Sequence, residues 1–398
     1  MRPPRLTRRR LLAASGLFFA AGAAFDPSVA ATPESDAALD LDAWPMPGRN
    51  PARTGFDPDG IAPRGDFSLA WETSVPDVAY GHRSLTVADG AVYVAADNSL
   101  LAVERDTGDV RWRFPGKTQR PWRRRVSFSA SPVAFSGGVL IPGRVDTFGF
   151  GSNDGQIGWS HDSSPGDSLF CRVGNTVYWQ GTDGTRVVDV ETGLERERSP
   201  LSTKVEPFAF RDGLLVGRGD SPDKLVAVNA QTGRLQWSVT LGVAHPSHLT
   251  PCIGTDAVFY GSGPLYAVSL ADGDVSWKGD IGTYQASIHP VTDGERVYAV
   301  AEDEEAETTF AVALDTETGD RVWRRETPLD PLCSPAVVGE TLYAATPAGF
   351  VVLDATNGEV LARFDAASGR GRARSPAVVD GTVYVGLDET LYAVEGSE

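Results

Sequence analysis

The stretch AVALDTETGDRVWRR, residues 311–325, carries the pattern that decides the fold of this chain. Apolar residues alternate before the turn, as in a half-buried β-strand, and Gly319 can supply the positive φ of a short hairpin loop. The side chains of Asp315 and Thr318 can bond the local backbone amides. Trp323 falls in the second strand, where its ring can pack between sheets and its N–H can meet a carbonyl. The stretch therefore predicts a β-hairpin with an inter-sheet tryptophan.

The same phrase returns at regular intervals along the chain. Four-stranded propeller blades repeat with about this period. A second apolar hairpin stands before the phrase, for example at residues 334–343 and 375–384, so that two hairpins make one blade. The turn glycine recurs in steps of 38 to 47 residues, at Gly108, Gly155, Gly193, Gly233, Gly273, Gly319 and Gly358.

The two ends of the repeat region complement each other. Residues 390–394 match the third strand of a blade and are followed by no fourth strand, whereas residues 67–73 match an outermost strand with no partners before them. We therefore expect residues 67–73 to pair with 391–394 and to close the ring. This predicts an all-β, eight-bladed propeller of four-stranded antiparallel blades. Its outermost strands would end near Trp71, Trp112, Trp159, Glu197, Trp237, Trp277, Trp323 and Ala362.

The N-terminus resembles a twin-arginine export signal. Arg8 and Arg9 stand just before an apolar run at residues 11–24, and the small residues at 28–30 offer a cleavage site. A membrane anchor is the alternative, but the run is too short for a bilayer core of about 30 Å. We expect a signal peptide at 1–30, a lead-in segment at 31–66 and a propeller at 67–398. The exported protein would be extracellular or held at the cell surface.

The charge of the chain limits its partners. The formal charge is −17, and removal of residues 1–30, which hold five arginines and one aspartate, makes it −21. Arginine outnumbers lysine by 32 to four and aspartate outnumbers glutamate by 34 to 19, a bias that resembles the proteins of salt-loving archaea. Such a negative field argues against general nucleic-acid binding, because phosphate backbones need clustered cationic contacts.

The three cysteines do not form a disulfide scaffold, because at most one pair of them can be bridged. They also occupy non-equivalent positions of the repeat. We interpret them as small buried or half-buried hydrophobes: Cys171, Cys252 and Cys333.

The repeated phrase closely resembles the repeats of the pyrroloquinoline-quinone (PQQ) type β-propeller family, over about residues 67–395. The lead-in at residues 44–55 resembles the segment that precedes such propellers in exported archaeal relatives. This family includes quinoprotein alcohol and sugar dehydrogenases and also non-catalytic scaffolds of the BamB kind. The resemblance implies that a dehydrogenase would carry an adjacent Cys-Cys pair, a Glu/Asn/Asp calcium set and a catalytic Asp. Here the cysteines are 81 residues apart.

We therefore expect a non-catalytic, BamB-like binding module, monomeric, with no catalytic residue, no metal site and no cofactor. The alternative is a PQQ-dependent oxidoreductase that uses calcium. His245 and His248 form the only close histidine pair, which is weak evidence for a metal. We interpret the repeated tryptophans as structural inter-blade residues rather than as PQQ contacts: Trp71, Trp112, Trp159, Trp237, Trp277 and Trp323.

A basic arc is the candidate binding surface, for a protein partner or an anionic ligand. Its residues fall in three neighbouring loops, each joining the outermost strand of one blade to the innermost strand of the next. Trp122 would serve as an aromatic anchor among arginines that can bond planar anions. In the simpler interpretation these arginines only pair with surrounding carboxylates. The arc consists of Arg83, Arg120, Trp122, Arg123, Arg124, Arg125, Arg370, Arg372 and Arg374.

Overall fold

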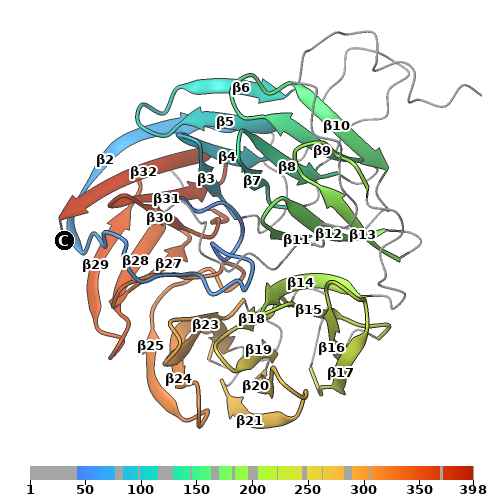
Figure 1. Cartoon of the computed structure of the whole chain (residues 1–398). Helices are drawn as coiled ribbons and strands as arrows, with labels where there is room; N and C mark the ends of the chain where they lie inside the picture. Colours follow the sequence, from blue (N-terminus) through green and yellow to red (C-terminus); the bar gives the residue numbers. More distant parts are fainter. Residues whose placement is uncertain are drawn as a thin grey trace, which may run out of the picture. The chain divides into compact units, whose positions relative to one another are not determined.

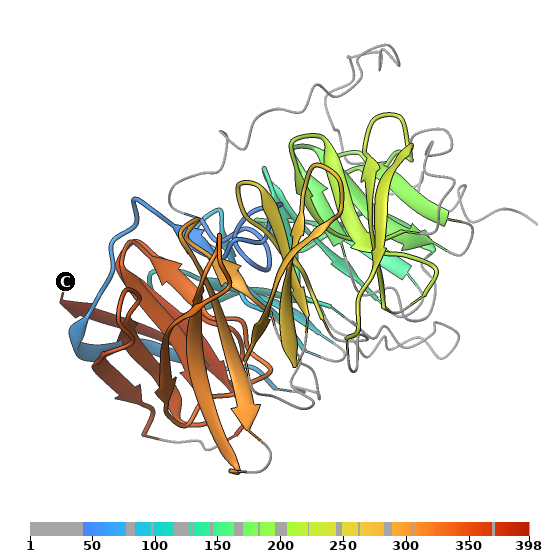
Figure 2. The same cartoon turned by 90° about the horizontal axis from the view of Figure 1, so that it is seen from below.

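A computed structural model gives the architecture of the chain. It describes residues 43–76, 84–96, 99–114, 128, 130–143, 146–162, 170–181, 184–195, 205–221, 223–243, 249–261, 263–281, 289–303, 306–367 and 371–397. The regular structure of these residues is entirely β-strand, in eight sheets that follow one another around a ring (Figure 1). Seen from below, neighbouring sheets stand side by side as twisted blades (Figure 2).

Each blade is an antiparallel sheet whose strands are lettered A to D from the axis outward. Blade 1 contains β3 (Thr86–Ala88), β4 (Ala91–Ala95), β5 (Leu100–Glu104) and β6 (Val110–Phe114), and blade 2 contains β7 (Val133–Phe135), β8 (Gly138–Pro142), β9 (Asp146–Gly151) and β10 (Ile157–Asp162). Blade 3 contains β11 (Phe170–Val173), β12 (Thr176–Gly181) and β13 (Gly184–Asp189). Blade 4 contains β14 (Glu206–Arg211), β15 (Leu214–Arg218), β16 (Lys224–Asn229) and β17 (Leu235–Thr240).

The second half of the ring repeats this order. Blade 5 contains β18 (Cys252–Ile253), β19 (Ala257–Gly261), β20 (Pro264–Ser269) and β21 (Val275–Asp280). Blade 6 contains β22 (Val291–Thr292), β23 (Arg296–Asp303), β24 (Thr308–Asp315) and β25 (Arg321–Glu326). Blade 7 contains β26 (Ala336–Val338), β27 (Thr341–Thr346), β28 (Gly349–Asp354) and β29 (Val360–Asp365). Blade 8 contains β30 (Ala377–Val379), β31 (Thr382–Leu387), β32 (Thr390–Ser397) and β2 (Gly65–Ser74).

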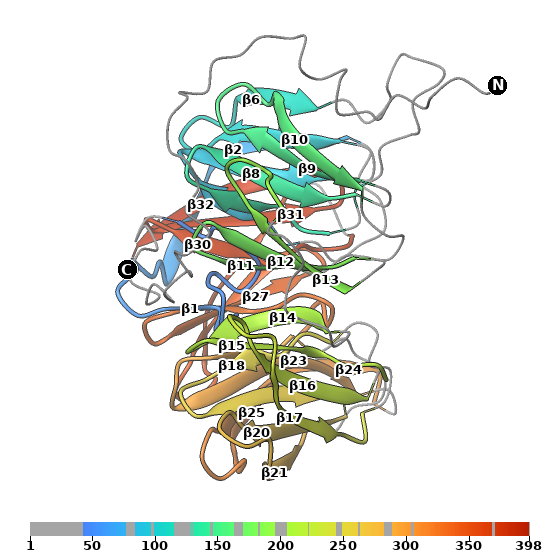
Figure 3. The same cartoon turned by 45° about the vertical axis from the view of Figure 1, so that its right-hand side comes forward.

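The ring closes as the sequence predicts. Strand β2 lies beside β32 as the D strand of blade 8 (Figure 3), with Leu69 opposite Val394 and Thr73 opposite Leu391. The eight-bladed, all-β propeller is thus confirmed. In blade 3 the described residues form three strands. An isolated β-bridge between Val188 and Glu195 lies where the fourth strand is expected. The predicted end of that strand, at Glu197, lies outside the described residues.

The alanine of the repeated phrase lies between two aromatic rings. In blade 6 the register places Tyr298, Ala313 and Trp323 side by side on strands B, C and D. The ring centroids of Tyr298 and Trp323 are 6.1 Å apart, because the small side chain between them lets the rings meet over the middle strand. Blades 1 and 8 show the same Tyr–Trp pair over Ala102 and Ala393, and blade 5 has a Phe–Trp pair over Ala267.

The acid and the glycine of the phrase form the C-to-D turn. Asp315 Oδ1 accepts the backbone N–H groups of Glu317 and Thr318, and these bonds lower the pKa of Asp315. Gly319 donates its N–H to the carbonyl of Asp315 (3.0 Å) and has a φ of +75°. The other six turn glycines also have positive φ and make the same bond, so the turn is repeated in blades 1 to 7.

Every described D strand except the reduced one of blade 3 contains a register shift beside its tryptophan position. An extra residue of this kind twists the strand and interrupts its row of hydrogen-bonding groups. The outer edges of the blades are therefore poor templates for pairing with another strand, which protects the exposed rim against aggregation.

Candidate functional site

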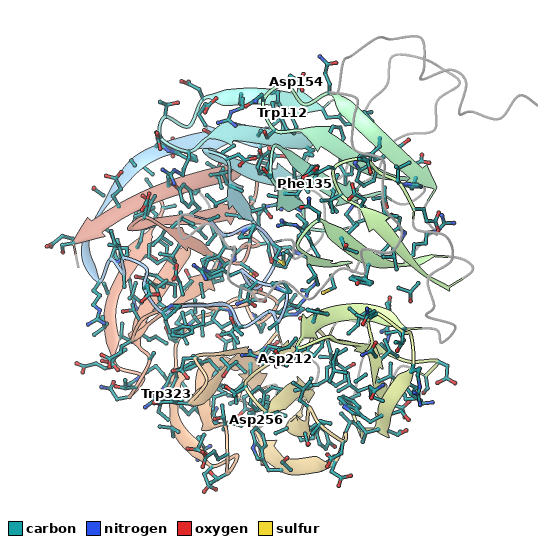
Figure 4. All side chains as sticks on the ribbon, viewed as in Figure 1. Trp112, Phe135, Asp154, Asp212, Asp256 and Trp323 are labelled. Atoms are coloured by element: carbon teal, nitrogen blue, oxygen red, sulfur yellow. The ribbon has the colours of Figure 1, made fainter. Side chains whose placement is uncertain are left out.

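The six tryptophans of the phrase occupy equivalent places between blades. Trp277 of blade 5 donates its indole N–H to the Thr316 carbonyl of blade 6 (2.9 Å), and its ring lies against the turn glycine Gly319. The other five tryptophans bond the next blade in the same way, at 2.8 to 2.9 Å: Trp71 to Arg105, Trp112 to Ser152, Trp159 to Val190, Trp237 to Leu270 and Trp323 to Ala355. Figure 4 labels Trp112 and Trp323 on separate blades.

These tryptophans are at most 9% exposed. Their rings face a neighbouring blade and their polar atom is satisfied by its backbone. The described geometry therefore gives the indole groups a packing role between blades.

The lead-in segment occupies the centre of the ring, which sequence reasoning did not predict. We call residues 44–57 the strap; it includes β1 (Phe56–Asp57), which pairs in parallel with β26. Figure 1 shows this blue segment among the inner strands. Its carbonyls accept backbone N–H groups near the ends of six A strands, at 2.7 to 2.9 Å: Val87, Ala134, Phe210, Ile253, Thr292 and Val337.

An ion pair holds the strap in a folded shape. Arg49 Nη2 lies 2.9 Å from Asp57 Oδ2, and both side chains are at most 7% exposed. Burial lowers the pKa of Arg49, while Asp57 opposes that change. Asn50 Nδ2 also donates to Thr54 Oγ1 (2.6 Å). One sequence signal points to this folded shape of the strap: Arg49 and Asp57 stand at the two ends of a short segment, where their opposite charges can pair.

A pocket of about 370 Å³ opens beside the strap, at the A-to-B turns of blades 4 to 6. Its charged groups mostly pair within the protein. Arg49 pairs with Asp57, and Asp293 accepts bonds from the backbone of Arg296 and from the Tyr298 hydroxyl. The described lining residues of the pocket thus offer little uncompensated charge to a ligand.

The basic arc falls mostly outside the described residues. Arg83, Arg120, Trp122 to Arg125 and Arg370 all lie there. Arg372 is exposed, and its backbone N–H donates to Asp388 Oδ1 (3.1 Å). Arg374 is only 4% exposed and packs over Gly386, so it does not present its guanidinium on the surface as the predicted arc requires.

The cysteines and the described histidines have structural surroundings. Cys171, Cys252 and Cys333 are buried thiols that form no disulfide. His161 Nε2 contacts the Gly193 carbonyl between blades 2 and 3, and His289 Nδ1 lies 2.7 Å from Thr250 Oγ1 between blades 5 and 6. His82, His245 and His248 lie outside the described residues. The described ranges contain no group of three His, Cys, Asp or Glu side chains placed to hold a metal ion.

Comparison with known proteins assigns the family. The sequence profile described as "outer membrane protein assembly factor BamB" matches residues 66–178, 143–284 and 221–398, which together cover most of the chain. The chain belongs to this family.

The similarity to individual members is more distant. BamB of Bordetella pertussis is 24% identical over 290 residues, covering 69% of this chain and 62% of that protein. The chain thus matches less than two thirds of the length of this relative.

Solved structures show the same fold. BamB from Moraxella catarrhalis superposes with a TM-score of 0.62 and 13% identity, over 83% of this chain and 98% of that one. The quinohemoprotein alcohol dehydrogenase of Comamonas testosteroni gives a TM-score of 0.66 and 13% identity, over 91% and 82%. Among the described residues no helix is long and apolar enough to cross a membrane.

Proposed function

We propose that this protein is an exported, non-catalytic propeller that binds a protein partner, in the manner suggested by its family of assembly factors. One observation carries this proposal: the residues that define the repeat are used for contacts within and between blades. In the phrase at 311–325, Ala313 separates two rings, Asp315 and Gly319 make the turn, and Trp323 bonds the next blade. The repeated chemistry builds a scaffold and supplies no reacting group.

A PQQ-dependent oxidoreductase is the second candidate, because a quinohemoprotein dehydrogenase shares the fold. The residues present do not fit the site that such an enzyme would need. The sequence has no adjacent cysteine pair. The three cysteines are buried and unbridged, and the described residues include no carboxylate cluster for calcium. We therefore propose that the protein uses no quinone.

The proposed binding surface is the face that carries the D-to-A loops, to which the sequence assigns the arginines of the basic arc, apart from the buried Arg374. A partner with an acidic surface fits this arc, since Arg forms bidentate bonds with carboxylates that salt weakens less than it weakens distant charges. Export by the twin-arginine route and adaptation to high salt are part of the same proposal. They rest on residues 1–30 and on the acidic composition.

The proposal is tested by capture of partners from the native cell envelope with purified, cross-linkable protein. We expect the double variant R123E/R124E to lose the captured partner. The matched control R234E/R321E reverses two exposed arginines at C-to-D turns on the opposite face and should retain it. Equal capture by both variants would refute the arc as the binding surface.

The enzyme alternative is tested separately by addition of PQQ and calcium to the purified protein. We expect neither a bound quinone absorbance nor dye reduction with alcohols or sugars. Stoichiometric quinone binding with turnover would overturn the non-catalytic assignment.

A further inference from the structure

The inner edge of the ring is a row of equivalent backbone donors. In a propeller the innermost strand of each blade has one free edge, whose N–H groups need acceptors. Val87, Thr292 and Val337 each follow the A-strand residue that lies opposite the B-strand tyrosine, so they hold the same place in three blades. Together with Ala134, Phe210 and Ile253, they donate to strap carbonyls in the order of the blades.

The strap follows this row around the axis. The carbonyls of Trp44 and Pro45 serve blades 1 and 2, those of Pro51 and Ala52 serve blades 4 and 5, and those of Thr54 and Gly55 serve blades 6 and 7. Six blades thus bind one short peptide through the same main-chain group. Main-chain bonds of this kind give affinity for an extended peptide, and side-chain pockets give selectivity.

The side chains of the strap enter separate parts of the core. Trp44 is 3% exposed and joins the cluster of blades 1, 7 and 8, whereas Met46 joins that of blades 2 and 3. Ala52 is 1% exposed and joins the cluster of blades 4 to 6. The positions of these side chains therefore select the sequence of the bound peptide.

The strap also has internal bonds that preserve its bound shape. Gly55 donates its N–H to the Gly48 carbonyl (2.9 Å), and the buried pair of Arg49 and Asp57 closes the same loop. A ligand that is already ordered loses less conformational entropy on binding. The segment after the strap is exposed at Pro58, Asp59 and Ile61, so the strap and β2 are joined by an accessible connection.

We propose that the inner edge of the ring is a sequence-selective peptide-binding site and that residues 44–57 are its intramolecular ligand. The site takes the same segment in trans when the resident strap is cut from the ring. This inference goes beyond the proposed function, since it concerns the inner edge of the ring and needs no partner of another kind.

The first test separates the strap from the ring in the folded protein. A protease site inserted between Asp59 and Gly60 allows cleavage after folding. The cut protein is then incubated with a fluorescent synthetic peptide of residues 43–58. We expect stoichiometric uptake of this peptide by the cut protein and none by the uncut protein. A peptide with W44A should bind about 30-fold more weakly or worse, because a buried aromatic anchor is lost.

Either of two outcomes would overturn the proposal. One is that the cut ring takes up no labelled peptide, whether it keeps its own strap or unfolds. The other is that a scrambled peptide of the same composition binds as well as the natural one.

The second test leaves the chain intact. An added Cβ at Gly55 would lie 2.4 Å from Val291 Cγ1, whereas Gly137 has a similar positive φ and no atom within 4 Å of an added Cβ. We expect G55A, but not the control G137A, to speed hydrogen exchange of the strap-bonded amides of Phe210, Ile253 and Thr292 by at least about tenfold. Unchanged exchange at these amides in G55A would show that the strap does not hold them.

Discussion

Substitution of the turn glycine Gly319 by alanine tests the contact that joins the blades. An added Cβ at Gly319 would lie 2.6 Å from Cδ2 of Trp277, in the preceding blade. Gly137 provides a matched control, because its φ is also +75° but an added Cβ would meet no atom within 4 Å. The two variants share the cost of a positive φ and differ in the inter-blade contact.

The structure sets the expected size of each effect. An alanine at positive φ costs about 1 to 2 kcal/mol, which is the whole effect expected for G137A. In G319A the Trp277 ring must also move away, which weakens its bond to the Thr316 carbonyl by about 1 kcal/mol and reduces its packing. Complete loss of a buried tryptophan costs about 3 to 5 kcal/mol. We expect G319A to destabilise the protein by about 3 kcal/mol in total.

Denaturant unfolding of the wild-type protein, G319A, G137A, W277A and the double mutant W277A/G319A measures these terms. In the W277A background the ring is absent, so G319A should cost only the backbone term, and the cycle should give a coupling of about 2 kcal/mol. Equal destabilisation by G319A and G137A, or a coupling near zero, would refute the idea that the turn glycine is required by the neighbouring tryptophan.

Three further predictions concern closure, tyrosine ionisation and thiol access. Removal of all residues before 75 deletes β2 and exposes the edge of β32, so it should lower the melting temperature and cause aggregation; an unchanged melting temperature would contradict the closure. Burial raises the pKa of Tyr260 and Tyr384 from 10 to about 12. The contribution of these two tyrosines to the free energy of unfolding is therefore complete below pH 10 and is lost as the pH rises through 12. Absorbance at high pH should show these tyrosines ionising together with unfolding, and ionisation of all tyrosines near pH 10 in the folded protein would count against their burial. The buried thiols of Cys171, Cys252 and Cys333 should resist a thiol reagent in the native protein and react after denaturation. Rapid reaction of any one of them in the native protein would place that thiol at the surface.

The sequence predicted the blades because each blade is coded locally. The alternating strands, the acidic turn and the tryptophan of residues 311–325 lie within one hairpin, so a short pattern is enough to indicate it. Closure by residues 67–73 was also accessible, because an unpaired outer strand at one end matched a missing one at the other.

The strap could not be predicted in the same way. Its hydrogen-bond partners come from six blades between Val87 and Val337, and a segment that bonds through its backbone needs no distinctive side-chain pattern. Arg49 and Arg53 have φ values of +67° and +57°, which non-glycine residues rarely adopt and which no sequence rule indicates. The burial of Arg374 was missed for a related reason. The space for its side chain is left by Gly386, a residue of β31 that charge patterns do not consider.

Two outermost strands carry another residue in place of the tryptophan, at Glu197 and Ala362, and the absence at Ala362 follows from the closure of the ring. Each tryptophan packs on the C-to-D turn glycine of the next blade, as Trp323 does on Gly358. Blade 8 has no such turn, because its C strand β32 and its D strand β2 come from opposite ends of the chain. A tryptophan at position 362 would therefore have no glycine to receive it.

An aromatic cluster joins blades 7 and 8 in its place. Phe67 of β2 meets Phe350 edge-on at 5.0 Å, and Phe350 stacks on Phe364 at 5.5 Å. Such pairs contribute about 0.5 to 1.5 kcal/mol beyond their buried area, so this contact can replace part of the missing indole. One of the two outermost strands without the tryptophan thus lies at the junction where the neighbouring blade is completed by a strand from the other end of the chain.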